Sequence, residues 1–215
     1  MVTLDIFSDP ICPWCWIGKA RLDRALERAG NPFQLRWHPF MLNPDMPAEG
    51  MDRRAYLEAK FGGKKEAVDA YLPVIEHAKA DGLPMDLERI TKTPSSLDAQ
   101  RLILWAELEQ CQSFVVQRLF EAYFRDGRDI SDRDVLADIA DGVGMDAAMV
   151  RRLLGSSADI DTVRSRDTAA REMGITSTPT FIVAGQHAVP GAQTTDLWMQ
   201  VIAEIEAAED APQPG

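Results

Sequence analysis

The sequence predicts an α/β fold in which helices flank one central sheet and a long helical segment interrupts the chain between its strands. Three observations lead to this prediction. Runs typical of strands occur near the two ends of the chain, and helical periodicity fills most of residues 51–155 between them. The strands at each end are too few to form separate sheets, so a single sheet is expected. The chain has 215 residues, of which 46% are hydrophobic, and this is enough for such a core.

The N-terminal part is predicted to run strand, helix, strand. Residues 3–8 alternate between apolar and polar side chains, and Asp9-Pro10 ends this strand. Apolar residues then recur at helical spacing over 17–29, and Gly30-Asn31-Pro32 stops the helix. Residues 33–40 alternate again and predict the second strand.

The middle of the chain is predicted to be a Pro- and Asp-rich loop over 41–50 followed by helices. Helix start signals, such as Ser131-Asp132 and Asp146, precede several of the periodic segments. The predicted helices cover residues 53–61, 64–82, 95–111, 113–125, 132–143, 146–154 and 159–173.

The C-terminal part returns to strands. The β-branched run 180–183 and the segment 187–189, joined by a tight turn at 184–186, predict a hairpin. A last amphipathic helix is expected over 196–208, and 211–215 is expected to be a loose tail.

The order of these elements also predicts two structural units. One unit would be built from residues 1–45 and 160–215, which carry the strands. The other would be an all-helical insertion formed by residues 46–159. No internal repeat is visible in the sequence, so a repeat architecture is not expected.

Composition excludes several classes of function. The formal net charge of −11 argues against a nucleic-acid partner, since phosphate binding needs a basic surface. No apolar run reaches the roughly 20 residues that cross a bilayer, so no membrane partner is expected. The first residues, from Met1, lack the basic and apolar regions of a secretory signal, and we expect a cytoplasmic protein. Three cysteines are too few for a disulfide-stapled scaffold.

The segment Cys12-Pro13-Trp14-Cys15 carries the chemistry. Its two thiols lie three positions apart, which allows them to bond to each other, and they come directly before the first helical pattern. Unpaired backbone N–H groups and the helix dipole at that point stabilise a thiolate, which is the form that attacks disulfides. The alternatives are two unrelated thiols or half of a zinc site. Such a site needs four ligands, and Cys111 with the scattered histidines supplies no second pair, so no metal is expected.

Two motifs together resemble the halves of a thioredoxin-fold active site. Cys12–Cys15 begins a helix, and Ser177-Thr178-Pro179-Thr180-Phe181 begins a late strand. The helical block between them resembles the insertion of the DsbA-type branch of that fold. The opening 7–18 is similar to the FrnE-like subgroup, as are the segments 40–44, 122–124 and 189–193. The resemblance implies a thioredoxin fold, a central mixed sheet flanked by helices, with a large all-helical insertion of DsbA type.

The resemblance also implies roles for the site residues. Cys12 would be the nucleophile and the exposed thiol of the pair, and Cys15 the resolving thiol one turn deeper. Pro13-Trp14 would tune the reduction potential, although Pro13 also suits plain helix initiation. The Thr178–Pro179 bond is expected to be cis and to face the cysteines, with Thr178 offering backbone hydrogen bonds to substrate. The alternative for Pro179 is an ordinary proline at the start of a strand.

Several other residues receive structural predictions. Gln100 occupies the position of a histidine that is frequent in the subgroup, so no imidazole is expected there. Cys111 lies in a helical pattern and is predicted to be a buried structural thiol. His38 is predicted to be structural, and core positions are predicted for Trp16, Trp37, Trp105 and Trp198. A substrate groove bordered by methionines is a further hypothesis, with Met41, Met46 and Met51 as the candidates.

Three functions remain in competition. The first is a thiol-disulfide oxidoreductase that acts on protein or small-molecule disulfides or dithiols, with no bound cofactor and with glutathione as a candidate co-substrate. The second is a glutathione-dependent isomerase or transferase, like 2-hydroxychromene-2-carboxylate isomerase and the kappa-class glutathione transferases. Those relatives commonly have serine at the position of Cys12, so retention of both cysteines favours the first. The third is a chaperone-like binder without catalysis.

Overall fold

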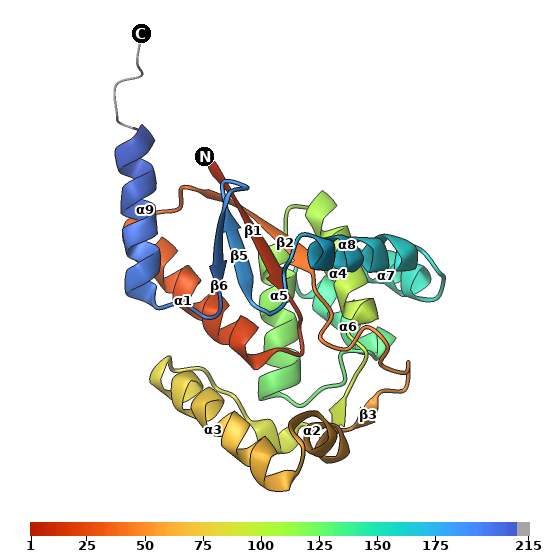
Figure 1. The fold of residues 1–215 in the computed structure, drawn as a ribbon. Helices are drawn as coiled ribbons and strands as arrows, with labels where there is room; N and C mark the ends of the chain where they lie inside the picture. The colour runs from red at the N-terminus through yellow and green to blue at the C-terminus, as the bar shows by residue number, and fades with distance from the viewer. Residues whose placement is uncertain (210–215) are drawn as a thin grey trace.

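The computed structural model describes residues 1–209, and its central sheet is mixed (Figure 1). The strands are β1 (Val2–Ser8), β2 (Phe33–Pro39), β5 (Thr180–Val183) and β6 (His187–Pro190), in the order β2-β1-β5-β6. Strand β1 runs parallel to β2 and antiparallel to β5, and β5 pairs antiparallel with β6. The predicted strands and their single mixed sheet are therefore confirmed.

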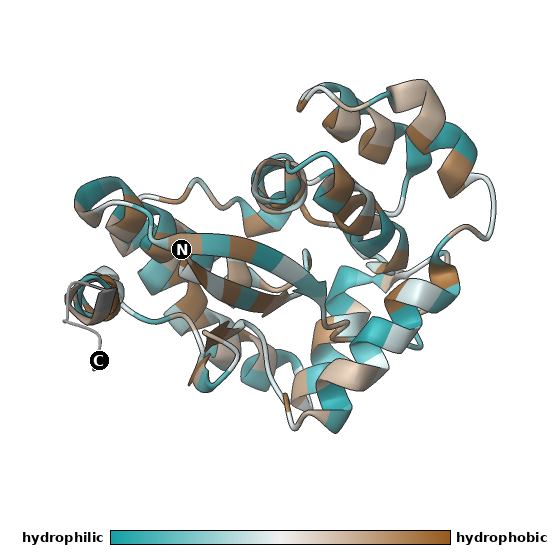
Figure 2. Cartoon of the chain, turned by 90° about the horizontal axis from the view of Figure 1, so that it is seen from above, coloured by the Kyte–Doolittle hydropathy of each residue, from teal (hydrophilic) through white to brown (hydrophobic). Residues whose placement is uncertain are grey.

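Helices cover both faces of this sheet. Helix α1 (Pro13–Ala29) and helix α9 (Thr195–Glu209) pack against each other on one side (Figure 1). On the other side, β2 is contacted by α4 (Leu97–Leu108), α5 (Gln112–Phe120) and α8 (Ile160–Glu172). Figure 2, turned to look along the layers, shows apolar residues along the central strands between the helices.

The remaining helices belong to the segment that interrupts the sheet. They are α2 (Arg53–Phe61), α3 (Lys64–Ala80), α6 (Arg133–Asp141) and α7 (Ala147–Leu154). Three of them begin at an aspartate whose side chain accepts a backbone N–H of the first turn, which offsets the unpaired donors there; these residues are Asp52, Asp132 and Asp146. The predicted helices are thus confirmed with small shifts of their ends.

The sheet and the helical segment share one hydrophobic core. Leu4 and Ile6 of β1 are fully buried, as the alternation predicts. The Trp16 ring of α1 stacks at 5.9 Å from the ring of Phe124, which lies in the helical segment. All four tryptophans predicted to be core residues are at most 8% exposed. The division into residues 1–45 plus 160–215 and residues 46–159 stays a prediction, since a shared core does not by itself define two units.

Local structure differs from the sequence prediction at several points. The predicted helix 113–125 is α5 followed by a π-helical turn, η2 (Glu121–Arg125). A two-stranded ladder pairs β3 (Met51–Asp52) with β4 (Lys92–Thr93), after the short 3-10 helix η1 (Leu87–Arg89). Strands of two residues carry no periodicity, so the sequence pattern could not predict them.

Helix α1 begins earlier than predicted. It starts at Pro13 instead of at residue 17, with Cys12 in the N-cap position. Proline is favourable in the first turn because its missing N–H would be unpaired there in any case. As a result, Pro13, Trp14 and Cys15 lie within the first turn of the helix.

The prediction for Cys111 was wrong. It does not lie inside a helix, since α4 ends at Leu108 and Cys111 is the N-cap residue of α5. The preceding Gln110 has φ of 55°, which breaks the helical path. Cys111 is half-buried, and partial desolvation raises the pKa of its thiol.

Two further sequence predictions concern the chain ends and membranes. The expected loose tail over 211–215 lies outside the described residues. Within residues 1–209, none of the helices combines the length and the apolar character that crossing a bilayer requires.

Candidate active site

The two cysteines of the first motif lie at the N-terminus of α1, directly after β1 and a short loop. The Cys15 backbone N–H donates to the Cys12 carbonyl at 3.1 Å, which closes the first turn. Both thiols are free. Cys12 is 4% exposed and Cys15 is 1% exposed, so the expectation of an exposed Cys12 is corrected. Cys12 nevertheless lines a cavity that opens beside the helix end.

The surroundings shift the pKa values of the two thiols in opposite directions. A hydrogen bond from the Cys15 thiol lowers the pKa of Cys12 below its usual value, and the Thr178 side chain adds to this effect against the cost of burial. Burial raises the pKa of Cys15 well above the usual value, and the hydrogen bond with Cys12 raises it further. The pair therefore holds one thiol that ionises readily and one that keeps its proton.

The loop before β5 faces Cys12. The Cys12 thiol lies 3.6 Å from the Thr178 carbonyl oxygen, to which it donates, and the Thr178–Pro179 peptide bond is cis. This loop packs closely on α1: a β-carbon added to Gly18 would lie 3.1 Å from Cγ of Pro179. A small residue at Gly18 therefore lets the loop approach the helix, a role that the sequence reasoning did not assign.

Asp9 is a buried carboxyl group next to the dithiol that the sequence reasoning missed. It is fully buried and accepts hydrogen bonds from the backbone N–H groups of Ile11 at 3.2 Å and Leu42 at 2.7 Å. Burial raises its pKa to about 6. The negative charge of Asp9 in turn raises the pKa of Cys12, against the effect of Cys15. Its position in Asp9-Pro10 was interpreted only as the end of a strand.

Gln100 lies beside the same strand end. It is 2% exposed, and its side-chain amide donates to the backbone carbonyl of Ser8 at 2.8 Å. The Ser8 hydroxyl, at the end of β1, acts to lower the pKa of Cys15. Gln100 thus supports the backbone next to the cysteines through a neutral amide, in agreement with the expectation that no imidazole lies there.

The cavity beside Cys12 has a volume of about 310 Å³. It lies between the N-terminus of α1, the loop before β5 and the helices α2 and α3. Its lining side chains include Pro13, Trp14 and Thr178 from the predicted site, together with Arg53, Tyr56, Lys60, Phe61, Tyr71 and Val74 of the helical segment. The structure therefore brings most predicted site residues to one cavity, although Pro179 packs against α1 behind it.

Two other residues with sequence predictions lie outside this cavity: Met41, which was predicted to border a groove, and His38, which was predicted to be structural. Met41 is 3% exposed, and its backbone N–H donates to the buried Asp167, so the prediction that it borders a groove was wrong. His38 bonds Asp5 at 2.7 Å and stacks on Phe7, in agreement with a structural role. In residues 1–209, the His, Cys, Asp and Glu side chains form no group of three or more that could hold a metal ion.

A family model described as a DsbA-like thioredoxin domain matches residues 3–203. The chain belongs to the DsbA-like thioredoxin family. This membership agrees with the mixed sheet, the cysteines at the start of α1 and the facing loop before β5.

Several solved structures have the same fold. A probable DsbA oxidoreductase of Streptomyces coelicolor is 27% identical and superimposes with a TM-score of 0.87. The match covers 100% of this chain and 94% of the oxidoreductase. A 2-hydroxychromene-2-carboxylate isomerase has a TM-score of 0.73 at 16% identity, over 98% of this chain and 100% of its own. The cytosolic disulfide reductase DsbM of Pseudomonas aeruginosa, solved with glutathione, has a TM-score of 0.67 at 19% identity. The match covers 97% of this chain and 100% of DsbM.

Proposed function

We propose that this DsbA-like chain is a thiol-disulfide oxidoreductase whose redox group is the Cys12–Cys15 pair. The opposite pKa shifts of the two thiols carry the proposal, since exchange needs one thiolate to attack and a second thiol held in reserve. The position of Cys12 at a cavity wall supports its role as the attacking thiol. The nearly complete burial of Cys15 supports its role as the resolving thiol.

The proposed reaction is two successive exchanges. The Cys12 thiolate attacks one sulfur of a substrate disulfide, the substrate S–S bond breaks, and the leaving thiolate takes up a proton. Cys15 then loses its proton and attacks the sulfur of Cys12 in the mixed disulfide. The second substrate thiol leaves with a proton, and Cys12 and Cys15 are joined by a disulfide. The protein has then lost two electrons to the substrate, and a thiol reductant restores it by the reverse steps.

The loop before β5 is proposed to position the substrate. The backbone of Thr178 lies within reach of the Cys12 sulfur, so a substrate sulfur bound there would have extended backbone beside it. Pro179 removes a backbone donor at the strand start and keeps the loop open. Pro13 and Trp14 are proposed to tune the reduction potential. The Trp14 ring packs in a T-shaped arrangement with the ring of His77 of α3, with 5.3 Å between the ring centroids, so it joins the motif to the helical segment.

Protein or small-molecule disulfides are proposed as substrates, with glutathione as co-substrate and a cytoplasmic setting. The structure of the cytosolic reductase DsbM with glutathione supports this choice by analogy of fold. The fold is also similar to that of an isomerase, with a TM-score of 0.73 against 0.67 for DsbM. Retention of both thiols, with their opposite pKa shifts, favours the redox reaction over the isomerase reaction.

Thiol counting under a defined redox buffer tests the proposal. The reduced chain has three free thiols, and equilibration with oxidised glutathione is expected to leave one, that of Cys111. The mass of the product should fall by two hydrogen atoms, because the Cys12–Cys15 disulfide closes and expels glutathione. Cys111→Ser serves as the matched control and should still lose two thiols. A stable glutathione adduct, or three remaining thiols, would contradict the proposed function.

A further inference from the structure

Among the residues that the structure describes, Arg53 is a buried cation without a carboxylate partner. It lies at the start of α2 and is 7% exposed. The other buried basic side chains of residues 1–209, Lys19, Arg21 and Arg101, each have a carboxylate oxygen within 2.7 Å. Because an unpaired buried charge is costly, the exception needs an explanation.

Neutral groups hold the Arg53 guanidinium in place. It donates to the hydroxyl of Tyr71 at 2.9 Å and to that of Tyr123 at 3.1 Å, and it lies over both rings. Burial raises the pKa of both tyrosines, so neither supplies a negative charge. A guanidinium has five N–H donors, and the two tyrosines accept from only two of them. The side chain is therefore fixed in orientation while much of its hydrogen-bonding capacity stays available.

The position of Arg53 connects it to the dithiol. Arg53 and Tyr71 line the 310 Å³ cavity together with Cys12, and Lys60 brings a second cation to the same wall. The Lys60 amine donates to the Tyr56 hydroxyl at 2.8 Å and has no carboxylate partner in the described residues. The cavity lining includes no aspartate or glutamate, although the whole chain has a net charge of −11. The two charged side chains that line the cavity are thus cationic, and Lys60 also interacts electrostatically with the buried Asp9 next to the dithiol.

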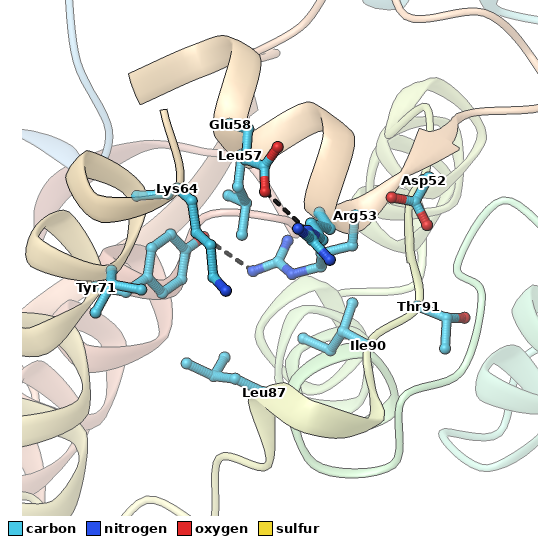
Figure 3. Close-up of a pocket in the computed structure, with 12 residues that line it drawn as sticks. Asp52, Arg53, Leu57, Glu58, Lys64, Tyr71, Leu87, Ile90 and Thr91 are labelled. Atoms are coloured by element: carbon cyan, nitrogen blue, oxygen red, sulfur yellow. Dashed lines mark hydrogen bonds and ion pairs between the residues drawn. The ribbon is translucent and has the colours of Figure 1, made fainter. Parts of the chain in front are cut away.

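A second cavity adjoins this wall. It has a volume of about 480 Å³ and lies between α2, α3 and the segment around η1 (Figure 3). Arg53 and Tyr71 line both cavities, and Figure 3 shows them beside each other, with Leu87 and Ile90 on the opposite side. The guanidinium therefore forms part of the partition between the two spaces.

We propose that Arg53, assisted by Lys60, binds a carboxylate of the substrate, so that the chain selects small disulfides that carry carboxylate groups. The inference rests on the proposed function, since the cavity becomes a substrate site only if Cys12 reacts there. A carboxylate on Arg53 would complete the charge pair that the fold leaves open. The guanidinium fork binds planar carboxylates in a two-point geometry, which would fix the substrate sulfur relative to Cys12.

A charge series of small disulfides tests the proposal. Reduction rates would be measured for oxidised glutathione, which carries carboxylates, for neutral 2-hydroxyethyl disulfide and for cationic cystamine. Relative to the wild-type chain, Arg53→Met should lower kcat/KM at least about tenfold for oxidised glutathione, the size of a lost hydrogen-bonded charge contact, and leave 2-hydroxyethyl disulfide unchanged. Rising salt should also weaken the preference of the wild-type chain for oxidised glutathione, as Arg53→Met does, because salt screens the attraction between opposite charges.

The matched control is Arg54→Met. Arg54 lies next to Arg53 on α2, but it is exposed and bonds Glu58 at 2.8 Å, and it does not line the cavity of Cys12. This variant removes the same charge and should leave the three rates unchanged. If Arg53→Met does not fold, Arg53→Lys keeps the charge without the two-point geometry, and it should show a smaller loss for oxidised glutathione alone.

Binding separates this inference from the proposed function. Reduced glutathione would be titrated into the Cys12→Ser chain by calorimetry, and binding is expected. In the double variant with Cys12→Ser and Arg53→Met, the affinity should be at least about tenfold lower. Binding that does not depend on Arg53, or equal loss for all three disulfides, would overturn the carboxylate subsite while the redox function stands. Arg53-dependent binding without reduction of any disulfide would instead overturn the proposed function and keep the subsite.

Discussion

Cys12→Ser is expected to lower the rate of disulfide exchange by roughly 10³-fold or more, because the attacking thiolate is lost and no other group in the cavity replaces it. Cys15→Ser should behave differently. Its Cys12 still attacks, but the mixed disulfide has no resolving thiol and accumulates. Reduction of 2-hydroxyethyl disulfide measures the first effect, and mass spectrometry of the intact chain measures the second.

Cys111→Ser is the control for both variants, since it removes a thiol that lies at the N-cap of α5, away from the residues of the cavity. Its exchange rate should equal that of the wild-type chain. Retained exchange in Cys12→Ser, or a mixed disulfide on Cys15 instead of Cys12, would show that the roles of the two cysteines are assigned wrongly.

The second large effect concerns Asp9 and the pH dependence of stability. Burial raises the pKa of Asp9 from 3.8 to about 6 in the folded chain, so the folded chain holds this proton more strongly than the unfolded chain. The resulting contribution to stability is fully present below pH 3.8 and is lost as the pH rises through about 6. A pKa difference of this size corresponds to about 3 kcal/mol.

Asp9→Asn isolates this contribution because the amide does not titrate. The free energy of unfolding of the wild-type chain, minus that of the variant, should fall by about 2 kcal/mol between pH 4 and pH 7 in urea titrations, since part of the full contribution is already lost at pH 4. Any hydrogen bond that the amide fails to make is lost at every pH and cancels from the comparison.

Asp126→Asn provides a control of opposite sign. A hydrogen bond from Arg125 lowers the pKa of the exposed Asp126, so its contribution to stability is present above the unfolded value of 3.8 and is lost as the pH falls through the folded value. The difference between the wild-type chain and this variant should therefore rise with pH below 3.8 and stay nearly flat between pH 4 and pH 7, where the Asp9 difference falls. A flat difference for Asp9→Asn across the same range would show that Asp9 is not held in the folded chain as the structure describes.

The fold was largely predictable because its signals are local. The alternation of residues 3–8 and 33–40 predicts strands, and Asp132 and Asp146 mark helix starts through their side-chain caps. The start of α1 and the interruption at Cys111 were less predictable, since Pro13 and Gln110 act through backbone geometry that periodicity does not report. Pairing of β3 with β4 depends on a contact between residues about forty positions apart in sequence.

The candidate site was predictable only in part, for the same reason. The motif of Cys12 and Cys15 is local, and the resemblance supplied the facing loop at Thr178. Asp9 could not be assigned beyond a strand end, because its burial depends on the backbone of Leu42. The role of Arg53 could not be predicted at all, since it depends on the packing of α2 and α3 beside the start of α1.

The pH dependence of thiol alkylation tests the central claim most directly, namely that the fold prepares Cys12 to attack and keeps Cys15 in reserve. Iodoacetamide would be added to the reduced chain across a pH series, and each cysteine would be followed by peptide mass spectrometry. We predict that Cys12 reacts first, with a midpoint below the usual thiol value of 9.0, and that Cys15 stays unmodified throughout that range. A Cys12 midpoint at or above 9.0, or earlier alkylation of Cys15, would contradict this account.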